Sequence, residues 1–264
     1  MAKEINVGEL KKIQLDILTR VAEFCDQNRL RYFLGYGTLI GAVRHKGYIP
    51  WDDDIDIVMP RADYQKLLTC FKVQDLEIVS PELNRDCPYT FAKIYNTKTQ
   101  LIELFDIKFD IGINIDVFPL DYFPDDVHES EKLMKRIHRL RCVIGAKGIT
   151  LVSKRSLIKN IILLMGKCVC SFLDYRTFIK KIVVHSQAYN ETNFVGNAVW
   201  GYGIKERVSK EIFNNCTDVE FEGRQFKAPI GYDQWLRHIY GDYMQLPPEE
   251  KRVTHHAFKA YWKE

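Results

Sequence analysis

The stretch that decides the fold is Trp51-Asp52-Asp53-Asp54-Ile55-Asp56-Ile57-Val58, in which acidic and branched apolar side chains alternate. Successive side chains of a β-strand point to opposite faces of the sheet, so this alternation predicts a strand with one buried face. We place the strand at residues 54–59, with Pro60 as its end. Asp54 and Asp56 then project to the same side, and Asp52 joins them if the extended conformation begins early.

The crowding of these carboxylates points to a bound cation. Like charges a few ångströms apart repel strongly when they are partly removed from water, and a divalent ion relieves that repulsion. Oxygen ligands suit Mg²⁺, especially where substrate phosphates complete its octahedral shell. A calcium-binding EF-hand loop starting at Asp52 is excluded, because its sixth and twelfth positions hold Ile57 and Asp63 instead of Gly and Glu. The alternative is a solvated acidic turn, which the interleaved isoleucines disfavour.

A second acidic strand is predicted at residues 113–117, Ile-Asn-Ile-Asp-Val, where Asp116 lies between apolar neighbours. If this strand lies beside the first, Asp116 joins Asp52, Asp54 and Asp56 as a metal ligand. Four carboxylates balance the charge of two Mg²⁺ ions, which suggests a two-metal phosphoryl-transfer site in which Mn²⁺ is a substitute ion. The alternative is that Asp116 caps the turn that follows the strand.

A glycine turn, Gly35-Tyr36-Gly37-Thr38, precedes the acidic strand and leads into a helix predicted over residues 38–43, with Thr38 as its N-cap. Backbone N–H groups at a helix N-terminus bind phosphate, and glycine permits close approach. The spacing fits neither a dinucleotide-binding G-x-G-x-x-G motif nor a P-loop, because residue 40 is Ile and no Walker lysine follows Gly41. By itself the turn is therefore only weak evidence for a phosphate site. Its position directly before the acidic strand strengthens that evidence.

The chain is nearly neutral and has an ordinary globular composition. Its 264 residues include 38 Lys and Arg against 35 Asp and Glu, and the net charge of +3 argues against nucleic acid as a partner. Seven scattered cysteines and a charged start without the apolar stretch of a signal peptide indicate a cytoplasmic location. Residues 147–181 are basic and partly apolar. We interpret them as a buried helix whose lysines reach solvent, the alternative being peripheral contact with the inner membrane face.

The remaining pattern predicts an α+β protein with a nucleotidyltransferase-like mixed sheet flanked by helices. Periodicity predicts several elements in the first half: helices over residues 10–25 and 62–71, and strands at 32–34, 91–95 and 101–104. Residues 127–187 have a mostly helical pattern, and Pro247-Pro248-Glu249-Glu250 predicts the start of a C-terminal helix. We expect a catalytic core over residues 1–126 and a helical and C-terminal region over 127–264 that packs on it as one compact unit.

These features together resemble the nucleotidyltransferase superfamily: a glycine turn that starts a helix, two aspartates one residue apart on the next strand, and a third on a later strand. The resemblance is closer over residues 37–56, GTLIGAVRHKGYIPWDDDID, which are similar to the LicD family and to its relatives fukutin and fukutin-related protein. Further similarity lies at residues 91–95, 116–121 and 240–256. The resemblance covers most of the chain, and the helical middle is its least diagnostic part.

The resemblance implies an enzyme. Members of the LicD family transfer phosphocholine from CDP-choline to cell-surface glycans such as teichoic acid or lipopolysaccharide, and the fukutin relatives transfer ribitol phosphate. We therefore expect Mg-dependent transfer of an alcohol phosphate, with phosphocholine favoured, from a CDP-linked donor to a glycan hydroxyl or its lipid-linked precursor, with release of CMP. The alternatives are a nucleotidyltransferase that releases pyrophosphate and a non-catalytic protein that binds a glycan or lipid.

The resemblance also implies roles for individual residues. Asp54 and Asp56, helped by Asp52, would hold Mg²⁺ against the donor diphosphate, and Asp116 would take the proton from the attacking hydroxyl. Further residues are expected to bind the substrates: Gly37, Thr38, Arg44, His45, Lys46, Lys93 and His256. Lys93 has the alternative of pointing to water. On a helix, His255 and His256 point about 100° apart, so at most one of the two enters the site.

The donor head group sets one further requirement. A choline group needs aromatic rings around its quaternary ammonium. The sequence offers several candidates for such rings: Tyr36, Trp51, Tyr95, Trp200 and Tyr202. The choice among choline, ribitol, glycerol and similar head groups stays open at this point.

Overall fold

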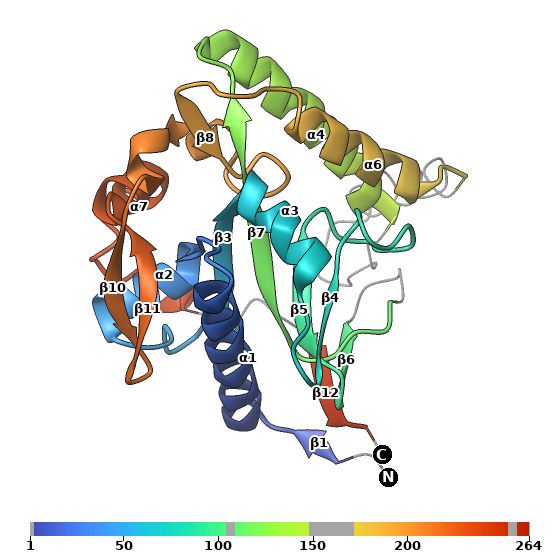
Figure 1. Cartoon of the computed structure of the whole chain (residues 1–264), viewed down its shortest axis with the longest axis vertical. Helices are drawn as coiled ribbons and strands as arrows, with labels where there is room; N and C mark the ends of the chain where they lie inside the picture. The colour runs from blue at the N-terminus through green and yellow to red at the C-terminus, as the bar shows by residue number, and fades with distance from the viewer. Residues whose placement is uncertain (1–2, 104–108, 148–171, 253–257, 264) are drawn as a thin grey trace.

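The computed structural model of the chain describes residues 3–103, 109–147, 172–252 and 258–263 (Figure 1). Its centre is a mixed β-sheet with the strand order β2-β3-β7-β5-β4. These strands are β2 (Phe33–Leu34), β3 (Asp56–Pro60), β4 (Leu76–Val79), β5 (Ala92–Asn96) and β7 (Asn114–Phe123). The β3–β7 pair is parallel, and its neighbours in the sheet pair antiparallel. The far end of β7 also pairs with β8 (Phe194–Gly196), which pairs in turn with β9 (Val208–Ser209).

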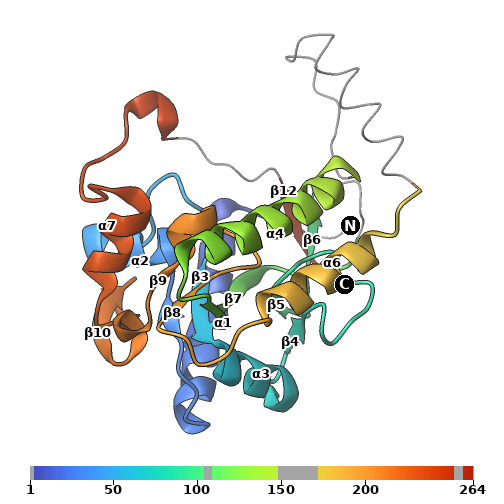
Figure 2. The same ribbon diagram turned by 90° about the horizontal axis from the view of Figure 1, so that it is seen from above.

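Helices surround this sheet, which confirms the α+β class. They are α1 (Val7–Gln27), α2 (Tyr36–His45), α3 (Arg61–Cys70), α4 (Val127–Lys147), α6 (Tyr175–Ser186) and α7 (Tyr232–Tyr240). Both α1 and α3 contact β7, and Figure 2 shows α4 and α6 lying side by side. The helices expected over residues 10–25 and 62–71 are therefore confirmed, as is the helical pattern of the described part of residues 127–187.

The described part of the chain also forms two smaller sheets. One has the order β1-β12-β6 and joins both ends of the chain: β1 (Glu4–Ile5), β12 (Phe258–Trp262) and β6 (Thr99–Glu103). The other is the hairpin of β10 (Cys216–Phe221) and β11 (Arg224–Pro229). Three short 3-10 helices lie at Gly203–Glu206, Lys210–Phe213 and Glu249–Lys251. The division at residue 126 and the nucleotidyltransferase-like topology stay predictions.

The prediction of a C-terminal helix is wrong. Pro247 and Pro248 do lead into a helical turn, but it is a 3-10 turn that ends after Lys251. Residues 258–262 form β12 instead, and they pair antiparallel with both β1 and β6. The reason is long-range. The strand bonds its backbone groups to two neighbours and buries Ala260, whereas a helix there would remove the strand that pairs with both β1 and β6.

The segment considered for membrane contact lies largely outside the described residues. Residues 148–171 belong to the part of the chain that the structure leaves out, so the interpretation of residues 147–181 as a buried helix stays a prediction. Among the helices that the structure does describe, none combines the length and apolar character needed to cross a bilayer.

A buried glutamine on α1 connects the acidic stretch to β7. Gln14 is 5% exposed, and its side-chain amide donates to the carbonyl of Asp53 over 3.0 Å and to that of Asn114 over 3.3 Å. Its own carbonyl oxygen accepts from the Tyr48 hydroxyl over 3.4 Å. Helix α1 therefore supplies one polar group that joins the loop before β3 to the start of β7.

We expect Gln14→Leu to destabilise the protein by about 1–3 kcal/mol, because it removes the buried amide that donates to two carbonyl oxygens. Urea denaturation followed by circular dichroism measures the change. The matched control is the exposed Gln65 on α3, whose side-chain amide donates to the Gln187 side chain over 3.3 Å. Gln65→Leu should change the free energy of unfolding by less than about 0.5 kcal/mol. Equal effects of the two substitutions would contradict the bridging role of Gln14.

Candidate active site

Parallel pairing of β3 and β7 brings their acidic residues together. In the register of this pair Asp56 lies opposite Asp116, and the Asp116 N–H donates to the Ile55 carbonyl over 2.8 Å. Asp54 lies two residues before the strand, which begins at Asp56 rather than at residue 54. Asp54, Asp56 and Asp116 line one cleft with a volume of about 770 Å³. The structure thus gathers three of the four carboxylates expected as metal ligands.

The start of α2 holds the backbone of Asp56 in place. The Gly35 N–H donates to the Asp56 carbonyl over 2.9 Å, and the Thr38 hydroxyl accepts from the Asp56 N–H over 2.8 Å. Thr38 is therefore not the N-cap that its position suggested: the N-cap is Gly35, and Thr38 lies inside the helix with its hydroxyl committed to β3. Thr38 thus holds the backbone of Asp56 and is not among the described residues that line the cleft.

Gly37 makes room for the fourth expected carboxylate, that of Asp52. A Cβ added to Gly37 would lie only 2.6 Å from Asp52 Oδ2, so no larger residue fits without displacing this carboxylate. Asp52 consequently lies against the first turn of α2, where the positive end of the helix dipole favours a negative charge. Neither Asp52 nor Gly37 is among the described residues that line the cleft.

Lys93 lies in the cleft beside the acidic residues rather than in solvent. It projects from β5 in register with Asp116, and its ammonium group donates to Asp116 Oδ1 over 2.6 Å and to Asn114 Oδ1 over 3.2 Å. The same nitrogen lies 4.8 Å from the centre of the Tyr89 ring. With 8% of its surface exposed, Lys93 is a buried cation that faces the acidic strands.

The charge balance of the cleft favours an added cation. Burial raises the pKa of the Asp56 carboxyl well above its usual value, the negative charges around it raise it further, and the Lys93 ammonium opposes the shift. These negative charges belong to Asp54, Asp116 and Asp52. The oxygen donors match what Mg²⁺ prefers. Among the described residues, however, no three acidic, His or Cys side chains already stand in the arrangement of a metal site. The residues thus fit the ion in the chemistry of their oxygen donors and in charge, and the described side chains do not already stand in its coordination geometry.

Aromatic rings form another wall of the cleft. Three of the candidate ring residues line it, namely Tyr36, Trp200 and Tyr202, together with Phe91 and Phe118. Phe91 connects the group, because its ring centre lies 4.3 Å from that of Phe118 and 5.8 Å from that of Trp200. The other two candidates lie elsewhere. Trp51 contacts His45, and the Tyr95 hydroxyl donates to Glu77.

A second cation reaches the cleft from α4. The guanidinium carbon of Arg141 lies 4.1 Å from the centre of the Trp200 ring, and burial lowers the pKa of Arg141. His138, one turn earlier, also lines the cleft. The sequence predicts neither residue, because α4 is rich in basic residues and no spacing separates Arg141 and His138 from the rest.

Three cations expected to bind substrate, Arg44, His45 and Lys46, lie at the C-terminal end of α2. Arg44 donates to the carbonyls of Tyr243 and Gln245, over 2.5 and 3.2 Å, and to the His45 ring over 2.9 Å. The Lys46 carbonyl accepts from the Glu222 N–H at the tip of the β10–β11 hairpin. Arg44, His45 and Lys46 are not among the described residues that line the cleft, and their role in substrate binding stays a prediction. His255 and His256 lie outside the described residues.

A buried glutamate supports the cleft from its far side. Glu206 is fully buried, and its carboxyl oxygens accept from the Tyr36 hydroxyl over 3.0 Å and from the Tyr202 N–H over 2.9 Å. Burial raises its pKa from an ordinary value of 4.5 to about 7, although these hydrogen bonds and the charge of Arg141 oppose the shift. Nothing in the sequence around Glu206 singled it out.

This shift predicts a pH dependence of stability. Between pH 4.5 and 7 the folded protein binds a proton at Glu206 that the unfolded chain has released, so stability falls as pH rises through this range. Relative to Glu206→Gln, wild type should lose on the order of 3 kcal/mol between pH 4 and 8. Thermal and urea unfolding at several pH values measure this difference. The exposed Glu220→Gln variant should follow wild type, and parallel pH profiles for wild type and Glu206→Gln would refute the prediction.

Comparison with known proteins agrees with this geometry. Residues 29–145 match the domain described as LicD/FKTN/FKRP, nucleotidyltransferase domain. The lipopolysaccharide cholinephosphotransferase LicD of Haemophilus influenzae is 34% identical over 268 residues, covering 98% of this chain and 99% of that protein. An uncharacterized protein of Rickettsia typhi is 38% identical over 74 residues, which cover 26% of this chain and 24% of its own length. The chain belongs to the LicD family.

Proposed function

We propose that the protein transfers phosphocholine from CDP-choline to a hydroxyl of a lipopolysaccharide glycan or its lipid-linked precursor, with Mg²⁺, and releases CMP. The observation that carries the proposal is the single cleft that combines the carboxylates of Asp54, Asp56 and Asp116 with a wall of aromatic rings. The similarity to a lipopolysaccharide cholinephosphotransferase along nearly the whole chain supports the choice of donor and acceptor.

The acidic side of the cleft suits the diphosphate end of the donor. Asp54 and Asp56 would hold Mg²⁺, which when bound neutralises the charge on the diphosphate. Lys93 and Arg141 supply two further positive charges in the cleft. Phosphoryl transfer depends mainly on positioning and charge neutralisation, so this set of groups is sufficient for the reaction.

Asp116 is the base in this proposal. The acceptor oxygen attacks the phosphorus that carries choline, the bond from this phosphorus to the CMP oxygen breaks, and the hydroxyl proton passes to Asp116. CMP leaves with the bonding electrons. The ammonium group of Lys93, 2.6 Å from Asp116 Oδ1, orients the carboxylate for this task.

The aromatic side of the cleft suits the head group. A quaternary ammonium cannot donate hydrogen bonds and binds instead to the faces of aromatic rings. Phe91, Phe118 and Trp200 lie in one contiguous group on this wall. Ribitol or glycerol would require polar partners for several hydroxyl groups, so the rings favour choline.

We expect the purified protein with CDP-choline, Mg²⁺ and delipidated lipopolysaccharide to release CMP and no pyrophosphate. Asp56→Asn should fold and lose about 100-fold or more of this activity, because a lost metal ligand removes several kcal/mol of charge stabilisation. Asp218→Asn, on the exposed β10–β11 hairpin, is the control and should retain activity. Pyrophosphate as the product would indicate a nucleotidyltransferase, and full activity of Asp56→Asn would remove this residue from the site.

The head-group assignment has its own test, which is thermal stabilisation by CDP-choline and CDP-glycerol with and without Mg²⁺. Trp200→Ala should reduce the preference for CDP-choline by about 3- to 30-fold, the value of one lost cation–π contact, while Trp200→Phe should keep most of it. An equal loss for both donors would mean that Trp200 acts only by placing Arg141. Stronger stabilisation of wild type by CDP-glycerol would overturn the choice of choline.

A further inference from the structure

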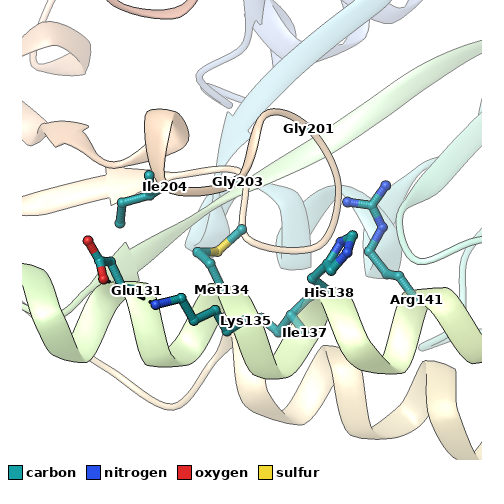
Figure 3. Close-up of a pocket in the computed structure, with 9 residues that line it drawn as sticks. All are labelled: Glu131, Met134, Lys135, Ile137, His138, Arg141, Gly201, Gly203 and Ile204. Carbon is teal, nitrogen blue, oxygen red and sulfur yellow. Dashed lines mark hydrogen bonds and ion pairs between the residues drawn. The ribbon is translucent and has the colours of Figure 1, made fainter.

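A second, smaller pocket opens beside the cleft. It lies between α4 and the loop that contains the 3-10 helix Gly203–Glu206, and its volume is about 380 Å³, within the range of small-molecule sites. Figure 3 shows the helix on one side and the loop on the other. Residues that line it include Glu131, Met134, Ile137 and His138 of α4, and Gly203 and Ile204 of the loop. We call it the side pocket.

The side pocket is continuous with the cleft, because the two share His138, Arg141 and Gly201 as lining residues. Figure 3 shows His138 and Arg141 pointing from α4 toward the loop. A ligand in the side pocket would therefore reach the cleft at the position of Arg141. This is the arrangement needed for a second substrate that enters beside the first.

The lining of the side pocket is amphipathic. Met134 and Ile204 supply an apolar surface, while Glu131 and His138 supply polar groups. The ammonium group of Lys135 lies 3.3 Å from the Glu131 carboxylate, so the positive charge at this rim is already paired. The cleft contains Lys93 in addition to Arg141, which the two pockets share, and so carries more positive charge. The diphosphate of the donor is thus better suited to the cleft, and an uncharged ligand to the side pocket.

A sugar has this combination of properties. Its C–H face packs on apolar side chains, and its hydroxyl groups bond to carboxylates, imidazoles and backbone groups. The glycines of the loop leave room for it: a Cβ added at Gly203, where φ is +67°, would meet nothing within 4 Å. At Gly201, by contrast, an added Cβ would collide with the carboxyl of Glu206. This carboxyl holds the loop against the cleft.

We propose that the side pocket binds a sugar residue of the acceptor glycan and guides its hydroxyl into the cleft. The inference rests on the proposed function and adds a location for the acceptor. Glu131 binds sugar hydroxyls, Ile204 and Met134 pack against the ring, and the shared wall at Arg141 is where the acceptor meets the donor.

Two substitutions on opposite walls test this assignment. Glu131→Gln replaces the carboxylate that accepts hydrogen bonds from sugar hydroxyls, with little change of shape. Ile204→Trp fills the pocket from the side of the loop. Both should raise KM for delipidated lipopolysaccharide by about 5- to 20-fold. KM for CDP-choline, and the thermal stabilisation by CDP-choline, should stay within about twofold of wild type. Glu129→Gln, an exposed carboxylate on the same helix that does not line the pocket, is the matched control and should behave as wild type.

The outcomes separate this inference from the proposed function. A rise in KM for CDP-choline instead of the acceptor would mean that the side pocket holds part of the nucleotide, and unchanged constants in both variants would mean that it holds neither substrate. Either result overturns the inference while leaving the transfer activity established. Absence of CMP release by wild type with every acceptor overturns the proposed function and the inference with it. If one variant unfolds at the assay temperature, the substitution on the opposite wall decides.

Discussion

The parallel pairing of β3 with β7 is the constraint on which the site depends, because its register puts Asp56 beside Asp116. A shift of one residue would turn one of these carboxylates to the opposite face of the sheet. Contacts from outside the pair hold the register. Gly35 and Thr38 bond both backbone groups of Asp56, and Gln14 joins the loop before β3 to β7. Helices α1 and α2 thus brace two carboxylates whose mutual repulsion opposes the pairing.

A second buried acid on β7, Asp121, shows how this fold neutralises a carboxylate that has a structural role. The Arg61 guanidinium binds both of its oxygens, at 2.6 and 2.8 Å, and 1% of Asp121 is exposed. Asp116 and Asp121 are five residues apart, so they lie on opposite faces of the strand. Asp121 binds a guanidinium through both of its oxygens, and the same Arg61 also reaches Glu82 over 3.3 Å, whereas Asp116 contacts the Lys93 ammonium and faces Asp56. Negative charge is therefore concentrated on the cleft face, as a cation-binding site requires.

Local pattern was sufficient to predict the acidic strands, because the alternation around Asp56 and Asp116 is a property of a few consecutive residues. The cations could not be predicted in this way. Arg44 is close to the acidic stretch in sequence but bonds the C-terminal loop, whereas Arg141 reaches the cleft through the placement of α4. In the same way, the two prolines at 247 and 248 predict where a helical turn begins but not its length. The strand at residues 258–262 depends on neighbours that are distant in sequence.

The buried carboxyl of Glu206 connects α2, which supports the acidic strand, with the loop that forms walls of both pockets. Tyr36, the first residue of α2, has a φ of 45° and donates its hydroxyl hydrogen to Glu206. The same carboxyl accepts from the Tyr202 N–H and occupies the space that a side chain at Gly201 would need. The helix that clamps Asp56 is thus tied to the loop that forms the aromatic wall and the side pocket. Because these contacts share one carboxyl group, Glu206 fixes the position of the loop relative to α2, whose Thr38 accepts from the Asp56 N–H.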